Sequence, residues 1–212
     1  MTTAIHDSQS ETTAGGRPSR IRDAGRIRIR LGYAAGGWAL LYAAYRGYYA
    51  LGGTIGMFGT PVSESQWRQI NAVGAVLLAM AAIVAFVTTT RLWNRRYVHM
   101  ALLTFAWVAF TGCVMHGLVD IATRLLSMAG VIHMEFPFWA SMDRRASNLQ
   151  DIFLNEPWFL IEGLLWGALG WIDLTTERAR RWWLFSALTA IALLTVDGLL
   201  TSTGVLGKVI IG

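Results

Sequence analysis

The stretch Tyr97–Ile132, YVHMALLTFAWVAFTGCVMHGLVDIATRLLSMAGVI, is the longest apolar run in this chain of 212 residues. It exceeds the roughly 20 residues that a helix needs to cross about 30 Å of hydrocarbon. Within it, His116, Asp120 and Arg124 recur at intervals of four. Residues four apart share one face of a helix, so Asp120 can pair with either neighbour. The run therefore predicts a membrane helix that carries an ionisable stripe.

Other apolar runs predict further membrane helices. These runs are Leu31–Phe58, Ile70–Thr90, Trp158–Ile172 and Trp182–Leu206. A composition of 54% hydrophobic and 15% charged residues excludes an ordinary soluble domain. We predict an all-α integral membrane bundle of five transmembrane helices, forming one domain over residues 31–212. Residues 1–30, rich in Ser, Thr, Gly and Arg, predict a disordered basic tail on the cytoplasmic side.

The distribution of arginines predicts the orientation in the cell membrane. Twelve arginines precede the first run or lie between runs two and three and between runs four and five, against four basic residues on the opposite side. Loops rich in Arg and Lys stay in the cytoplasm, so we predict a multi-pass protein with its N-terminus inside and its C-terminus outside. The basic tail suits contact with anionic lipid headgroups. Nucleic acid is not an expected partner, because no soluble face interleaves basic and aromatic residues.

Charged residues in the other runs fall near the same depth as Asp120. Counted along the predicted helices, Arg46, Glu162 and Asp197 also lie in the outer half of the membrane. An ionisable group in hydrocarbon is costly unless it finds a partner or water, so these residues predict a shared polar chamber. The alternative is that the charges neutralise one another as packing contacts between helices.

Aromatic residues flank these charges at helical spacing. Trp158 and Trp166 lie one turn on either side of Glu162, and tyrosines accompany Arg46 on the first predicted helix. Rigid, electron-rich rings suit walls around a lipophilic ligand or a cationic intermediate. The predicted substrate-binding residues are Arg46, Tyr45, Tyr49, His116, Trp158 and Trp166.

The connection His133–Pro157, between the third and fourth predicted helices, is too aromatic for a plain hydrophilic loop. It contains the aromatic stretch Phe136–Trp139 and then becomes charged from Asp143 onward. This order predicts an interfacial helix that lies over the chamber as a lid. A surface anchor without a gating role is the alternative.

Two segments carry a resemblance to known proteins. Trp38–Arg46, WALLYAAYR, and Asn155–Gly163, NEPWFLIEG, resemble a group of small multi-pass membrane proteins of actinomycetes, a group that supplies no activity. In parts, the chain also resembles membrane-bound terpene cyclases, which hold acidic residues among aromatic ones inside a helical bundle. This second resemblance implies an isomerase or lyase that catalyses acid-initiated, metal-independent cyclisation of an isoprenoid or meroterpenoid.

The cyclase interpretation assigns roles to the carboxyl groups. A carboxylic acid in an apolar site can stay protonated near neutral pH and protonate an epoxide or alkene. Glu162 is the first candidate for this general acid, Asp197 is a second acid or orients the first, and Asp120 stays ionised beside Arg46 or Arg124. No metal or cofactor is expected, because the sequence has no aspartate-rich motif and no Cys/His cluster with zinc spacing.

Two other classes of function fit the same charges. A proton-coupled small transporter or efflux component would use intramembrane carboxylates to load and release protons. The sequence shows no inverted repeat of the kind common in carriers, and a homo-oligomer would supply the missing symmetry. A non-catalytic membrane subunit would turn its charges towards a partner protein instead.

Overall fold

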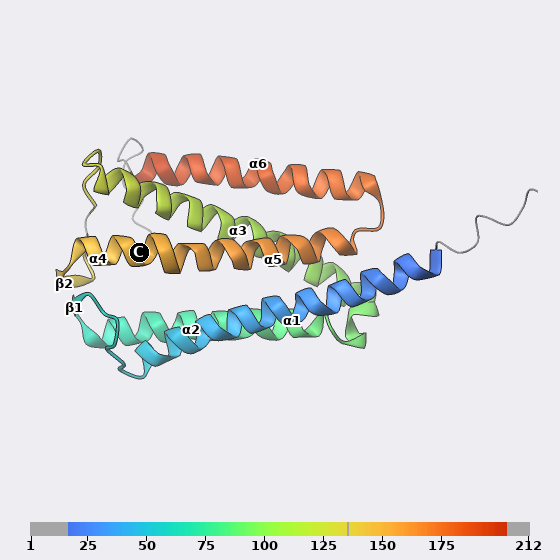
Figure 1. Ribbon diagram of the computed structural model, residues 1–212, viewed down its shortest axis with the longest axis horizontal. Coiled ribbons are helices and arrows are strands. Elements are labelled where there is room, and N and C mark those ends of the chain that lie inside the picture. The colour runs from blue at the N-terminus through green and yellow to red at the C-terminus, as the bar shows by residue number, and fades with distance from the viewer. Residues whose placement is uncertain (1–16, 135, 203–212) are drawn as a thin grey trace, which may run out of the picture.

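Long helices lying side by side make up the structure, a computed structural model that describes residues 17–134 and 136–202 (Figure 1). In the described residues these helices are α1 (Arg17–Ala50), α2 (Glu64–Val87), α3 (Arg96–Met128), α5 (Glu156–Asp173) and α6 (Glu177–Ser202). The predicted all-α fold class is confirmed.

Short elements complete the chain between the long helices. The strands β1 (Gly59–Pro61) and β2 (Trp139–Met142) pair in an antiparallel two-stranded sheet. The 3₁₀ turn η1 (Arg91–Asn94) precedes α3. The helix α4 (Arg144–Gln150) begins where the side chain of Asp143 accepts a hydrogen bond from the Ala146 amide, and the π-helical turn η2 (Asp151–Asn155) joins α4 to α5.

Membrane-spanning character is strongest in three helices of the described range. The helices α2, α3 and α6 are long and apolar enough to cross a membrane. Tyrosine, glycine and Arg46 dilute the apolar residues of α1, and α5 has only 18 residues. Five transmembrane helices therefore stay a prediction for α1 and α5.

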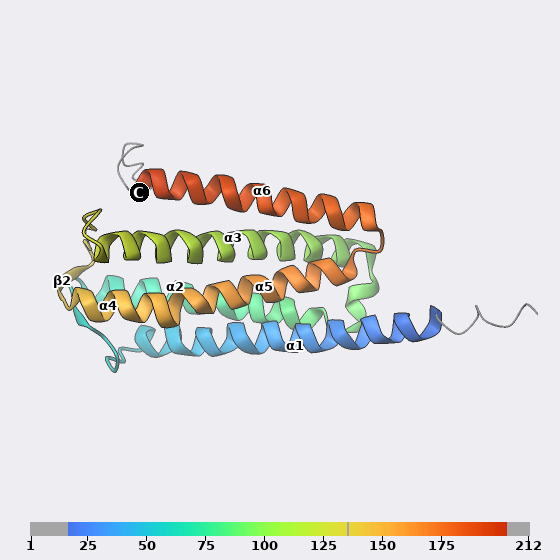
Figure 2. The ribbon, with the colours of Figure 1, turned by 45° about the horizontal axis from the view of Figure 1, so that its top comes forward.

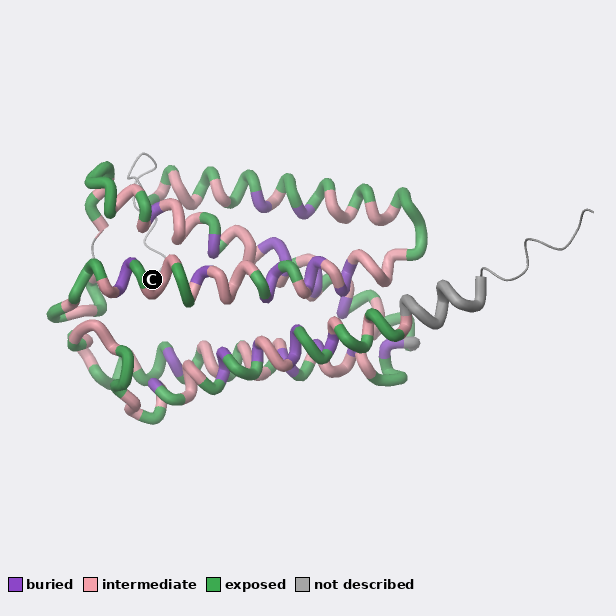
Figure 3. Tube along the Cα trace, in the orientation of Figure 1, coloured by how far each residue is buried: buried purple, intermediate pink, exposed green. Residues whose placement is uncertain are grey.

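Helix pairs organise the bundle. The helix α1 packs along α2, α3 packs along α5, and the two pairs meet where α1 contacts α5 (Figure 2). The helix α6 packs on α3 and scarcely touches α5. A Cβ atom at Gly36 would clash with the Phe86 ring, and one at Gly163 would lie 2.8 Å from Val114. Glycine therefore permits the close helix contacts, and buried residues follow the facing sides of the helices (Figure 3).

The N-terminal segment is more helical than predicted. Because α1 begins at Arg17, residues 17–30 of the predicted disordered tail are helical. Arginine, a good helix former, recurs through this stretch, and Pro18 stands in the first turn, where a proline is tolerated. Residues 1–16 of that tail and residues 203–206 of the fifth predicted run lie outside the described residues.

The connection between α3 and α5 also differs from the prediction. In place of an interfacial helix that starts with the aromatic stretch, Trp139–Met142 forms β2 and only Arg144–Gln150 forms a short helix. Pro137 disfavours helical geometry in the residue before it, and β1 supplies a strand partner. The sheet and α4 lie across the end of the bundle, where the predicted lid was placed (Figure 1).

Candidate functional site

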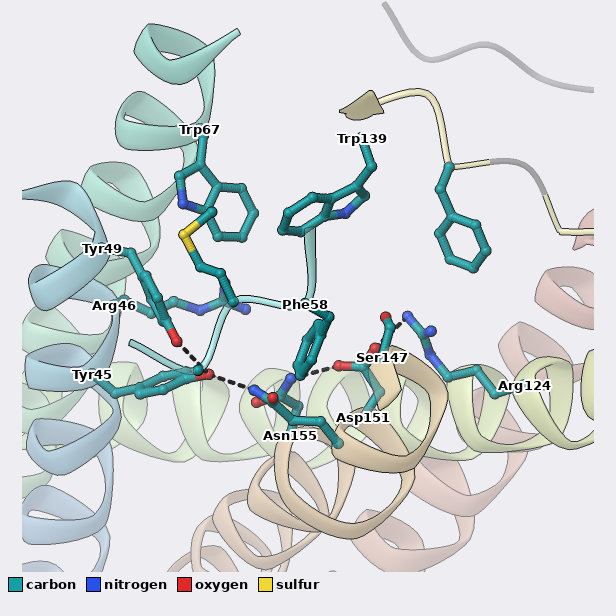
Figure 4. A pocket seen from close by; sticks show the side chains of 14 residues that line it. Tyr45, Arg46, Tyr49, Phe58, Trp67, Arg124, Trp139, Ser147, Asp151 and Asn155 are labelled. Carbon is teal, nitrogen blue, oxygen red and sulfur yellow. Dashed lines mark hydrogen bonds and ion pairs between the residues drawn. The ribbon is translucent and has the colours of Figure 1, made fainter. Parts of the chain in front are cut away.

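A cavity of about 180 Å³ lies at the end of the bundle that the sheet and α4 cover (Figure 4). Its walls come from α1, α2, α3, α4, η2 and the two connections that contain the strands. A cavity of this volume holds a group of roughly the size of benzene. Six aromatic side chains line it: Tyr45, Tyr49, Phe58, Trp67, Phe136 and Trp139.

A larger groove of about 650 Å³ adjoins the cavity. It lies between the β1 connection and the start of α2, and Tyr49, Met57 and Trp67 belong to the walls of both spaces. These three side chains therefore form the boundary between the cavity and the groove.

Arg124 forms a double ion pair in the cavity wall. Its Nε donates to Oδ2 of Asp120 at 2.7 Å, and its Nη2 lies 2.7 Å from Oδ2 of Asp151. The remaining terminal nitrogen, Nη1, donates to Oδ1 of Asn148 at 3.0 Å. The structure therefore pairs Asp120 with Arg124, and not with Arg46, the other arginine predicted as its partner. Asp151 belongs to the π-helical turn, a geometry often found at functional sites.

Arg46 lines the other side of the cavity and has neutral partners. Its Nη1 donates to Oδ1 of Asn71 at 3.1 Å, and its Nη2 donates to the hydroxyl of Tyr42 at 3.2 Å. Asn71 is fully buried and is fixed in turn by donating to the carbonyl of Trp67 at 2.8 Å. The ion pairs formed among the described residues do not include Arg46.

Tyr45 and Tyr49, two of the residues predicted to bind substrate, both lie in the cavity wall. Gln150 donates to the hydroxyl of Tyr45 at 2.8 Å, and the hydroxyl of Tyr49 donates to the carbonyl of Ile55 at 2.9 Å. The two rings meet edge to face with centroids 5.1 Å apart. These hydrogen bonds connect α1 to α4 and to the connection after α1, so they hold the end of the bundle together.

Trp158 and His116 lie behind the cavity and are not among its lining residues. Trp158 stacks with the rings of Trp38 and Tyr42, whose centroids lie 4.1 and 5.4 Å away. His116 places Nε2 3.6 Å from Oε2 of the buried Glu156. Both predicted residues therefore support the first turns of α5 from outside the cavity.

Glu162 and Trp166 form a pair of their own in the core. Trp166 donates from Nε1 to Oε1 of Glu162 at 2.7 Å, and Oε2 of Glu162 is buried without a hydrogen-bond partner. Both side chains are almost fully buried, 4% exposed for Glu162 and 1% for Trp166. Neither of them lines the cavity. Of the two tryptophans predicted to flank Glu162, Trp166 contacts it, whereas Trp158 stacks on rings of α1.

Asp197 lies on an exposed face of α6, and none of the side-chain hydrogen bonds or ion pairs among the described residues involves its carboxylate. The prediction of one chamber for Arg46, Asp120, Glu162 and Asp197 is therefore wrong. Arg46 lines the cavity, whereas Asp120 is paired with Arg124 and is not itself a lining residue. Glu162 lies in the core between α3 and α5, and Asp197 lies on the exposed face of α6. Depth along a helix fixes the level of a side chain but leaves its direction open.

Several residues of the site were missed by the sequence reasoning. Asn71 was detectable as a polar residue inside the second apolar run, and Asp151 and Asn155 as polar residues four apart just before the fourth. The rings of Trp67 and Trp139, 5.0 Å apart, come from segments too distant in sequence to be matched. Within the described ranges, no group of three or more His, Cys, Asp or Glu side chains could hold a metal ion.

Comparison with known proteins adds no further assignment. No protein-family model, curated protein or solved structure matches this chain. The site geometry alone therefore supports the functional argument.

Proposed function

We propose that this protein is a multi-pass membrane enzyme that binds a lipophilic substrate in the cavity at the end of the bundle. The observation that carries the proposal is the cavity wall, in which six aromatic side chains surround a space bordered by Arg46, Arg124 and Asp151. Aromatic walls with a few convergent polar groups are typical of small-molecule sites. The lipid bilayer is the medium from which such a substrate would come.

The proposed topology places the cavity on the outer side of the cell membrane. All five long helices would cross the bilayer, with the arginine-rich connections in the cytoplasm. The helices α2, α3 and α6 support this arrangement through their length and apolar composition. A substrate would then reach the cavity from the outer leaflet or through the adjoining groove.

The proposed reaction is acid-initiated cyclisation of an isoprenoid or meroterpenoid. An acid would protonate an alkene or epoxide, the chain would close on the cation, and loss of a proton would return it to the enzyme. Aromatic faces at cation–π distance stabilise such positive charge, and walls that exclude water prevent early quenching. No metal or cofactor takes part in this scheme.

The geometry favours a different acid from the one that the sequence suggested. Asp151 is the carboxyl group in the cavity wall, and Glu156 lies beside Asp151 and Asp120. Asp120 and Asp151 are ion-paired with Arg124, whereas Glu156 is buried and forms no ion pair with that guanidinium. We therefore assign the acid to this cluster in place of Glu162 and Asp197: Glu156 would hold the proton, and Asp151, ionised beside Arg124, would relay it to the substrate.

Membranes that contain the protein, supplied with linear and epoxidised isoprenoids and analysed by mass spectrometry, test this function. Asp151→Asn should lower turnover by about 10² or more, because it removes the carboxylate that relays the proton at nearly constant shape. Glu177→Gln, at the far end of the bundle, should leave turnover unchanged. Full turnover by Asp151→Asn would remove this residue as the proton relay. No turnover by the wild type would favour a transporter or a non-catalytic subunit.

A further inference from the structure

Arg46 has hydrogen-bond donors that the described residues do not use. A guanidinium carries five N–H groups. Two hydrogen bonds, to Asn71 and Tyr42, are formed by Arg46 with described residues. The other arginine of the cavity, Arg124, is engaged by two carboxylates and an asparagine. Arg46 therefore differs from Arg124 in having three unused donors and, among the described residues, no carboxylate partner.

The partners of Arg46 fix its guanidinium from one side. Asn71 is 0% exposed and Tyr42 is 2% exposed, so both hold the guanidinium from the protein side while the side chain lines the cavity. A cation that is partly removed from water is destabilised unless a counter-charge compensates it. Asp151, the carboxylate in the same wall, forms its ion pair with Arg124 and lies beyond ion-pair distance of Arg46.

We propose that the substrate is an amphipathic anion whose carboxylate or phosphate binds Arg46. The planar fork of an arginine matches both groups in a bidentate arrangement. The lipophilic body would lie against the aromatic wall and continue past Tyr49, Met57 and Trp67 into the adjoining groove. This inference rests on the proposed function, since it names the chemical class of the substrate for the same site.

Binding of matched isoprenoids to the purified full-length protein tests the inference. The probes are farnesoic acid, farnesyl phosphate and farnesol, added to nanodiscs of phosphatidylcholine and followed by quenching of tryptophan fluorescence. Both anions should bind at least about tenfold tighter than the alcohol, as a charge-assisted hydrogen bond predicts. Inorganic phosphate alone should neither bind detectably nor displace farnesyl phosphate at equal concentration, because it lacks the apolar body.

Substitution of Arg46 locates the preference. Arg46→Gln should lose the preference for the two anions and keep the affinity for farnesol, and Arg46→Lys should keep part of the preference because the charge remains. The control Arg91→Gln, at the opposite end of the bundle, should keep all of it. If Arg46→Gln does not fold, the comparison of acid with alcohol on the wild type and on Arg46→Lys decides the matter.

Two results would overturn the inference: equal affinity of the wild type for acid and alcohol, or a full preference in a folded Arg46→Gln. The conversion assay separates this failure from failure of the proposed function. Turnover of neutral isoprenoids with no preference for anions would overturn the inference and still support the proposed enzymatic function. A preference for anions that depends on Arg46, without turnover, would support the inference and exclude the cyclase.

Discussion

At the scale of single residues, Arg124 is the best test of the buried charges. It contacts Asp120 and Asp151 at 2.7 Å each, and its side chain is 12% exposed. Asp120→Asn leaves Arg124 one carboxylate, whereas Arg124→Gln strands two. We therefore expect Arg124→Gln to cost about 3–5 kcal/mol and Asp120→Asn less, measured by thermal unfolding in detergent.

The exposed pair Arg68 and Glu64, which has the same spacing of four residues, gives a matched control for Arg124. Arg68→Gln should change the free energy of unfolding by only about 0.5 kcal/mol, because the side chains of Arg68 and Glu64 are both exposed to solvent. If Arg124→Gln proves as mild as Arg68→Gln, the double ion pair does not stabilise the fold.

Glu162 separates packing from chemistry. Glu162→Gln keeps an oxygen that accepts from the Trp166 indole, so we expect a loss in stability of less than about 1 kcal/mol. Glu162→Ala leaves the indole N–H without an acceptor, which should cost about 1–3 kcal/mol of stability. Because Glu162 does not line the cavity, turnover by Glu162→Gln should stay near that of the wild type. A loss of about 10² in turnover with stability intact would instead return the role of acid to Glu162.

At the scale of secondary-structure elements, the two-stranded sheet is a candidate lid. Thr60 and Ser141 are paired across β1 and β2, at a spacing that a disulfide can bridge. In a Cys113→Ala background, cysteines at both positions should form a disulfide that slows isoprenoid binding, and reduction should restore the rate. Stopped-flow tryptophan fluorescence measures this rate.

Single-cysteine variants at the same two positions control for the substitutions themselves. An equal binding rate in the oxidised and reduced double variant would show that the sheet is a fixed cover and that access runs elsewhere.

Local patterns predicted the long helices but not the elements that close the site. The i,i+4 spacing placed Asp120 beside Arg124, and apolar runs located the cores of α2, α3 and α6. The strands β1 and β2 are too short to carry a pattern, and each becomes a strand only by pairing with a segment about 80 residues away. The cavity that they help to enclose was therefore invisible in the sequence.

At the scale of the whole molecule, Asp197 tests which face of α6 meets lipid. It is exposed on a helix apolar enough to cross a membrane, a costly position for a carboxylate. Asp197→Leu should keep or raise the thermal stability of the protein in detergent, whereas Asp120→Leu should lower it. Lower stability or a smaller assembly for Asp197→Leu in light scattering would indicate that this face packs against a second copy.

The orientation of the bundle is open to chemical labelling. Thr60 lies at the cavity end, and Thr175 lies in the connection between α5 and α6 at the opposite end (Figure 1). In a Cys113→Ala background, a membrane-impermeant thiol reagent applied to intact cells should label a cysteine at position 60 and not one at position 175. Labelling of both would place the two ends of the bundle on one side of the membrane.

The most direct measurement of the central claim is photo-crosslinking of an isoprenoid to the protein in membranes, followed by peptide mapping. A diazirine-bearing farnesyl probe should modify peptides that contain Met57, Trp67 or Trp139, which line the cavity. An excess of unlabelled isoprenoid should compete with this labelling. Labelling confined to the exposed faces of α2 and α6, without competition, would show that the protein meets isoprenoids only as it meets bulk lipid, and would contradict a binding site in the cavity.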